Sequence, residues 1–181
     1  MKICTSKFFA ILLFGIIVSI IIIFPSCSTS SDSTSSLYYQ NAPEIIMADS
    51  LGKTCKLSDT KGKLVLLEFW NSAYIESRNA QFEINRLFNI YKDEEFKNGD
   101  GFTVFSVSLD KDKSVWKSAL AHAGLKWTYQ VCDFKGWNSP AAIAYGVNTA
   151  PKYFLIDGEQ RILPYNFLIQ DLEELLQKEM K

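Results

Sequence analysis

Hydrophobic and polar positions change their spacing several times along the chain, and each spacing predicts one kind of element. Unbroken apolar runs bounded by polar or glycine residues are typical of buried strands, whereas apolar residues three or four apart are typical of helices. The predicted strands cover residues 64–70, 102–109, 127–131, 152–156 and 161–167. The predicted helices cover residues 113–123, 140–145, 171–180 and a stretch from about 74 to the acidic run at 93–95.

Two further details refine this pattern. The turn residues of 49–53 lie between the short apolar stretches 45–47 and 54–57, which predicts a β-hairpin ahead of the first long strand. Pro164 interrupts the last predicted strand, which therefore belongs at a sheet edge. The alternation of strands and helices predicts an α/β sandwich, with a mixed sheet flanked by helices and an N-terminal hairpin extension.

The N-terminal segment differs from the rest of the chain. Lys2 and Lys7 precede an apolar stretch at residues 8–24, which is typical of a secretion signal or a short membrane anchor. The next residues, Phe24-Pro25-Ser26-Cys27, resemble a bacterial lipobox, in which the cysteine is lipidated and becomes the new N-terminus. The alternative is an uncleaved anchor with Cys27 at the membrane face. Both place the rest of the chain outside the cytoplasm, because the basic residues hold the N-terminus inside.

A polar, serine- and threonine-rich stretch at residues 28–36 follows and predicts a flexible tether. We therefore expect a lipoprotein signal at 1–26, a lipidated cysteine with its tether at 27–37, and one folded domain at 38–181. The expected location is the bacterial cell envelope, with the membrane contacted through the lipid on Cys27.

Charge excludes one class of partner. The formal net charge is −1, and loss of Lys2 and Lys7 with the signal leaves 17 basic against 20 acidic residues. A mildly acidic chain without a basic, aromatic-interleaved patch argues against nucleic-acid binding.

Cysteine usage leaves two thiols in the predicted domain, Cys55 and Cys132. In an oxidising compartment they could form a structural disulfide. They could equally be two small, buried, unpaired side chains.

The stretch from Leu64 to Ala80 carries the main functional signal. A strand ends at Phe69-Trp70 and a helical pattern begins at about Tyr74, so that free backbone N–H groups and the helix dipole converge between them. This segment resembles the active site of the thioredoxin-like superfamily, in particular the membrane-attached TlpA/ResA-type reductases, in which Cys-x-x-Cys follows the Phe-Trp pair. By that resemblance the two cysteine positions fall on Tyr74 and Ser77.

The substitutions remove the family's chemistry. In a dithiol site the first cysteine attacks as a thiolate and the second resolves the mixed disulfide, which neither a phenol nor a serine hydroxyl can do. The resemblance also implies an acidic residue and a proline where Ala80 and Phe82 stand. Glu68 matches the family's buried acid beneath the site, and without a thiol to serve we expect it to bond neighbouring polar groups.

A second landmark lies at Thr149-Ala150-Pro151. It resembles the family's cis-proline, which starts a strand facing the active-site turn and helps to bind extended peptides. We therefore predict a cis Ala150–Pro151 bond and a peptide groove between residues 70–77 and Pro151. Trp70, Tyr74 and Trp137 are candidate contacts at its rim, with ordinary packing as the alternative for each tryptophan.

Two functions follow. The leading hypothesis is a lipid-anchored, thioredoxin-like protein that binds a peptide or protein without catalysis. The alternative is a thiol–disulfide oxidoreductase or peroxidase-like redoxin that uses Cys132 or Cys55. We expect no cofactor and no metal, because the single histidine, His122, has no second ligand of a suitable kind placed beside it.

Overall fold

A computed structural model of the protein describes residues 39–181, so the predicted signal, the lipidated Cys27 and the tether lie outside the described residues. The strands are β1 (Ile46–Ala48), β2 (Thr54–Lys56), β3 (Leu64–Trp70), β4 (Glu95–Phe96), β5 (Gly99–Asp100), β6 (Phe102–Ser108), β7 (Tyr129–Cys132) and β8 (Lys152–Ile156). The α-helices are α1 (Ile75–Tyr91), α2 (Lys113–Ala123), α3 (Pro140–Ala144) and α4 (Leu172–Glu179). Short 3₁₀ helices cover Leu57–Thr60, Gly136–Asn138 and Ile169–Asp171.

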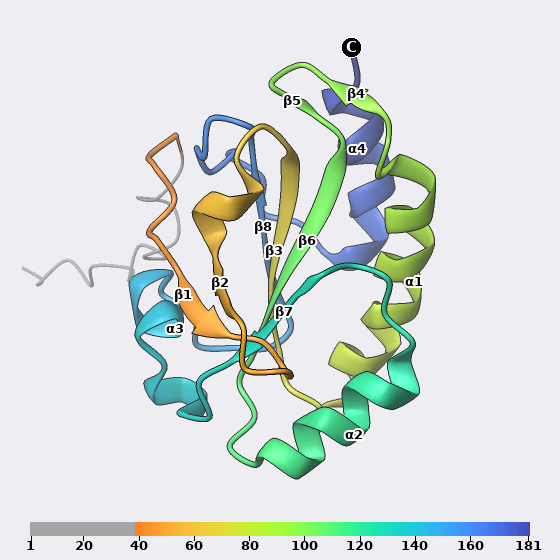
Figure 1. Cartoon of the computed structure of the whole chain (residues 1–181). Helices are drawn as coiled ribbons and strands as arrows, with labels where there is room; N and C mark the ends of the chain where they lie inside the picture. The colour runs from red at the N-terminus through yellow and green to blue at the C-terminus, as the bar shows by residue number, and fades with distance from the viewer. Residues whose placement is uncertain (1–38) are drawn as a thin grey trace, which may run out of the picture.

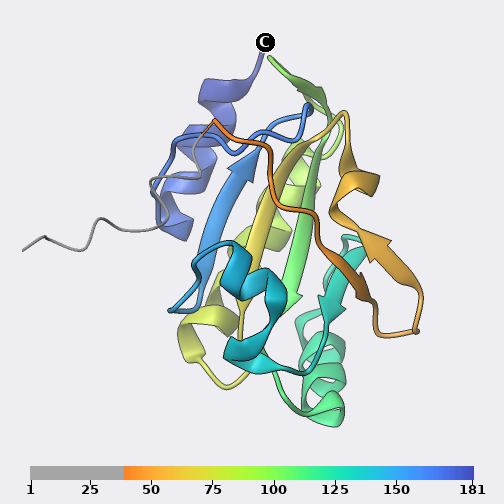
Figure 2. The same cartoon turned by 90° about the vertical axis from the view of Figure 1, so that its left-hand side faces the viewer.

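A four-stranded mixed sheet forms the centre of the fold, in the order β7-β6-β3-β8. Strand β3 is parallel to β6 and antiparallel to β8, and β7 is parallel to β6. Helices α1 and α4 lie on one side of this sheet, whereas α3 and the β1–β2 hairpin lie on the other (Figures 1 and 2). The predicted α/β sandwich with a mixed sheet and an N-terminal hairpin is therefore confirmed.

Alternate residues of β3 supply the cores on the two faces, as the two-residue period of a strand requires. Val65, Leu67 and Phe69 pack with the hairpin and α3, whereas Leu64 and Leu66 pack with α1 and α4. All seven residues of β3 are buried. A strand covered on both faces reads as a continuous apolar run, and for this reason the sequence pattern identified it well.

Helix α2 begins and ends where its capping residues dictate. The Asp112 carboxylate accepts hydrogen bonds from the backbone N–H groups of Ser114 and Val115, and Gly124 follows the helix in the left-handed conformation. Ser139 occupies the N-cap position of α3, but its hydroxyl makes no capping bond.

One predicted segment differs in the structure. Residues 161–167 are not a strand: Arg161 and Ile162 form only isolated bridges, and Leu163 donates to Leu155. Pro164 has no N–H to continue the ladder, so pairing stops there. The polar stretch at 97–101 contains β5, which pairs antiparallel with β4 directly before that stretch and forms a tight hairpin.

None of the helices formed by residues 39–181 is both long enough and apolar enough to cross a membrane.

Candidate functional site

The turn after β3 is held by side-chain bonds to the segment after β6. The Asn71 side-chain amide donates to the Leu109 carbonyl oxygen (3.0 Å), and its own oxygen accepts from the Ala73 N–H (2.9 Å). The Leu109 N–H donates to the carbonyl oxygen of Trp70 (2.8 Å). The junction between β3 and α1 is therefore fixed on both sides of Asn71.

The carboxylate of Asp110 also holds the same turn in place, through hydrogen bonds to Ser72. It accepts from the hydroxyl of Ser72 (2.8 Å), from the N–H of Ser72 (3.2 Å) and from the hydroxyl of Ser108 (2.7 Å). The carboxylate is buried, and these charge-assisted bonds compensate for its lost hydration. No sequence motif points to Asp110, although its place directly after a buried strand is a usable signal.

Tyr74 and Ser77 lie at the N-terminus of α1. The TlpA/ResA-type reductases, which this segment resembles, carry their two cysteines at this place. Tyr74 is the N-cap residue, makes no side-chain capping bond and is 39% exposed. Ser77 is fully buried, and its hydroxyl accepts a hydrogen bond from the Asn71 N–H (3.3 Å). The turn and the first turn of α1 contain no thiol.

Glu68 lies beneath this turn, fully buried in β3. Its two carboxylate oxygens accept from the Gln81 side-chain amide (2.7 Å) and from the Ser106 hydroxyl (2.8 Å), and Trp127 Nε1 donates to that same hydroxyl (3.0 Å). Burial raises the pKa of Glu68 from 4.5 to about 7, because desolvation outweighs the two hydrogen bonds. The structure thus gives Glu68 the neighbouring polar partners that the sequence led us to expect.

Both cysteines within residues 39–181 have free thiols and are buried. Cys132 packs against Trp70 and Trp116, with its Sγ 3.4 Å from the Asp110 carbonyl oxygen. Cys55 lies in β2 of the hairpin and packs into the core between the hairpin and the sheet, among different neighbours. Desolvation raises the pKa of each thiol, so burial disfavours the reactive thiolate.

The three candidate rim aromatics do not share one environment. Trp70 is only 1% exposed and packs against Trp116 and Cys132. Trp70 therefore acts mainly in packing, which is the alternative to a contact at the rim of the groove. Tyr74 and Trp137 are each more than a third exposed.

The Ala150–Pro151 bond is cis, as predicted. A cavity of about 590 Å³ lies beside Pro151. Glu76, Ala80 and Glu83 of α1 line it on one side, and Leu168 lines it from the segment before α4. Trp70, Tyr74 and Ser77 do not line this cavity, which therefore lies further along α1 than the groove predicted from the sequence.

Other site chemistry is sparse within residues 39–181. No group of three or more histidine, cysteine or acidic side chains is arranged to hold a metal ion in this part of the chain. His122 is exposed on α2, and its Nδ1 lies 2.7 Å from the Ser118 carbonyl oxygen.

Comparisons with known proteins agree with this fold. The curated thiol-disulfide oxidoreductase ResA of Bacillus thuringiensis is 28% identical over 136 residues, which span 75% of this chain and 73% of that protein. The thioredoxin domain of a thiol-disulfide oxidoreductase from Bacteroides vulgatus superposes with a TM-score of 0.69 at 28% identity, covering 78% of this chain and 96% of that one.

A thiol-disulfide oxidoreductase from Bacteroides fragilis superposes with a TM-score of 0.62 at 30% identity, and the match covers 75% of this chain and 99% of that one. The family model of the AhpC/TSA family matches residues 39–170, which is most of the chain and nearly all of its described part. The chain therefore belongs to the AhpC/TSA family and has the thioredoxin-like fold of the thiol-disulfide oxidoreductases.

Proposed function

We propose that this protein is a lipid-anchored, extracytoplasmic member of its family whose dithiol site is degenerate and which binds an extended peptide or protein segment without catalysis. Tyr74 and Ser77 take the places of the two cysteines, and Cys27 carries the lipid. The observation that carries the proposal is the chemistry of the side chains at the β3–α1 turn. Dithiol exchange needs two sulfurs there, but Tyr74 supplies a phenol and Ser77 a buried hydroxyl.

The cavity beside Pro151 supports the binding role. It joins α1 to the segment before α4 and combines apolar with charged walls: Leu168 is 61% exposed, whereas Glu76, Glu83 and Lys152 supply charge of both signs. An exposed leucine in a concave site is a typical anchor for an apolar side chain of a partner.

We expect Leu168→Asp to weaken peptide binding at this cavity by about tenfold or more, because a buried carboxylate would face the partner's apolar side chain. The measurement is fluorescence anisotropy with a pool of short, labelled, cysteine-free peptides. Leu51→Asp is the matched control, since Leu51 is 91% exposed in the β1–β2 turn and far from Pro151 in the sequence. Equal binding by both variants and the unaltered chain would remove the cavity from the proposal.

One observation favours the alternative of an oxidoreductase that uses Cys132. This thiol packs against Trp70 and lies next to Asp110, which holds the β3–α1 turn, so an opening of the turn would bring sulfur toward the site. Its burial and raised pKa oppose such a role in the closed structure.

A further inference from the structure

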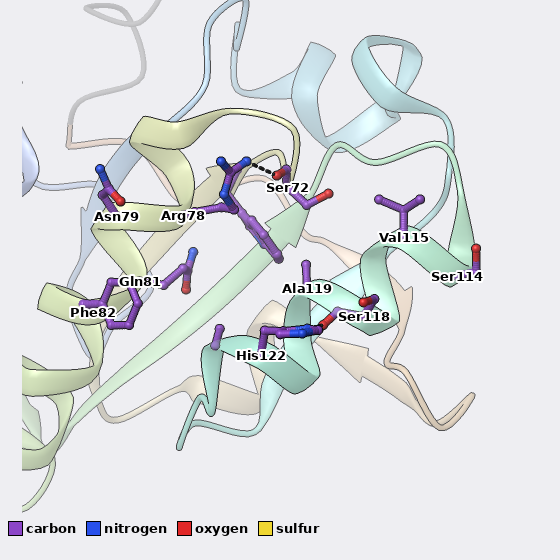
Figure 3. A pocket seen from close by; sticks show the side chains of 12 residues that line it. Ser72, Arg78, Asn79, Gln81, Phe82, Ser114, Val115, Ser118, Ala119 and His122 are labelled. Carbon is purple, nitrogen blue, oxygen red and sulfur yellow. Dashed lines mark hydrogen bonds between the residues drawn. The ribbon is translucent and has the colours of Figure 1, made fainter.

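A second cavity, of about 570 Å³, lies between α1 and α2 (Figure 3). Arg78, Gln81 and Phe82 of α1 line one wall, and Val115, Ala119 and His122 of α2 line the other. Trp70 also lines it. Its volume falls in the range of small-molecule sites. It shares only Asn79 with the cavity beside Pro151, so the two are separate places on the molecule.

Two buried polar atoms belong to side chains that line this cavity and have no hydrogen-bond partner within the described residues. They are the indole Nε1 of Trp70, a donor, and the amide Oε1 of Gln81, an acceptor. These side chains belong to residues that are 1% and 2% exposed. In Figure 3 the Gln81 side chain projects from α1 toward α2. Buried polar groups are nearly always bonded, so this unpaired donor and acceptor beside the cavity are the groups that a ligand would satisfy. Neither atom is exposed to solvent, so each side chain has to rotate slightly to reach a ligand.

The hydrogen bond between the Gln81 amide nitrogen and Glu68 sets the orientation of the Gln81 amide. Its Nε2 donates to Glu68 at 2.7 Å, which leaves Oε1 as the atom to be satisfied. A ligand therefore needs an N–H or O–H group for Gln81 and an acceptor oxygen for Trp70. An amide group provides both in one unit.

The charge of the lining defines the rest of the ligand. Arg78 is the one permanently charged residue among the described residues that line the cavity, and no carboxylate lines it. One guanidinium nitrogen of Arg78 donates to the Ser72 carbonyl oxygen (2.7 Å, dashed in Figure 3), which leaves its other donors for an anion. Phe82, Val115 and Ala119 supply apolar surface nearby.

From these groups we infer that the cavity binds a small N-acylated amino acid with an apolar side chain, either free or as the last residue of a short peptide. The carboxylate pairs with Arg78, the amide N–H donates to Gln81 Oε1, and the acyl oxygen accepts from Trp70 Nε1. The apolar side chain packs between Phe82 and Ala119. This site is independent of the peptide groove beside Pro151.

The test uses the full-length chain in detergent, labelled with ¹⁵N, and N-acetyl-L-phenylalanine as the probe. We expect the indole N–H resonance of Trp70, identified by its loss in Trp70→Phe, to shift and saturate during titration. N-acetyl-L-phenylalanine amide, which lacks the charge, and 3-phenylpropionate, which lacks the amide, should each bind at least about tenfold more weakly. A Trp70 resonance that does not move with the probe would overturn the inference, as would equal affinity for all three compounds.

Arg78→Ala gives the second measurement, because Arg78 is exposed and its removal leaves the core intact. We expect this variant to bind the acid and the amide with the same affinity, whereas Lys117→Ala, which removes an exposed positive charge from α2 outside the cavity, keeps the preference for the acid. Retained preference in Arg78→Ala would contradict the assignment. An N-acetylated peptide ending in phenylalanine separates the two sources: affinity equal to the probe's indicates a peptide end, and weaker affinity indicates a free small molecule.

Discussion

Replacing Tyr74 and Ser77 together with cysteine is expected to give this chain a reversible disulfide with a potential of roughly −120 to −270 mV, the range of catalytic couples. Tyr74 is the N-cap of α1 and Ser77 lies one turn further on, so both sulfurs would meet at a helix N-terminus. There, the free N–H groups and the helix dipole stabilise a thiolate. Tyr74 is partly exposed and Ser77 is close to cysteine in size, so neither change disturbs the core.

The measurement is the disulfide fraction of the double variant across glutathione buffers, together with the rate at which it reduces insulin. The pair Asn79→Cys and Phe82→Cys is the matched control, since it has the same spacing at exposed positions beyond the first turn of α1. We expect the control to lack the low-pKa thiolate and the insulin activity. If Tyr74→Cys with Ser77→Cys behaves like the control, these two positions are not a degenerate dithiol site.

Glu68 provides the second large expected effect, on stability against pH. Its pKa is about 7 in the folded chain and returns to its ordinary 4.5 on unfolding. Between these values the folded state holds a proton that the unfolded state has released, so the contribution of Glu68 to stability is fully present below pH 4.5 and is lost as pH rises through 7. The expected loss is about 3 kcal/mol in the free energy of unfolding, and it stays constant above that range.

Glu68→Gln removes this loss, because the amide keeps the shape and needs no proton. The free energy of unfolding of the variant and of the unaltered chain, measured in urea at about pH 5 and about pH 8, should converge at the lower pH and separate in favour of Glu68→Gln at the higher one. Glu76→Gln, on the exposed surface of α1, controls for the charge change. Parallel pH dependence of all three proteins would show that Glu68 is not held neutral by burial.

The sequence predicted best those elements whose local pattern and tertiary environment agree. Strand β3 is covered on both faces, so its apolar run is continuous. Helix α2 carries its own start signal at Asp112 and its own stop signal at Gly124, and its predicted bounds of 113–123 match the structure. The short strand β7 was predicted at residues 127–131 and runs from Tyr129 to Cys132.

What the sequence missed depends on contacts between distant segments. No local pattern places Asp110 under Ser72, thirty-eight positions away in the chain. The cavity between α1 and α2 likewise arises from the packing of two helices, and His122 gave no sign of lining it. Burial of Cys132 against Trp70 and Trp116 is a tertiary outcome too, which left its role open from the sequence alone.

The most direct test of the proposal that this protein lacks dithiol chemistry is the redox state of its own thiols. The full-length chain in detergent is equilibrated across glutathione buffers, alkylated, and mapped by peptide mass so that Cys55 and Cys132 are read separately. Because the two thiols are buried among different neighbours, we predict that both stay free, with no change near −200 mV. Interconversion of the pair between dithiol and disulfide at roughly that potential, in the range of catalytic couples, would contradict the account.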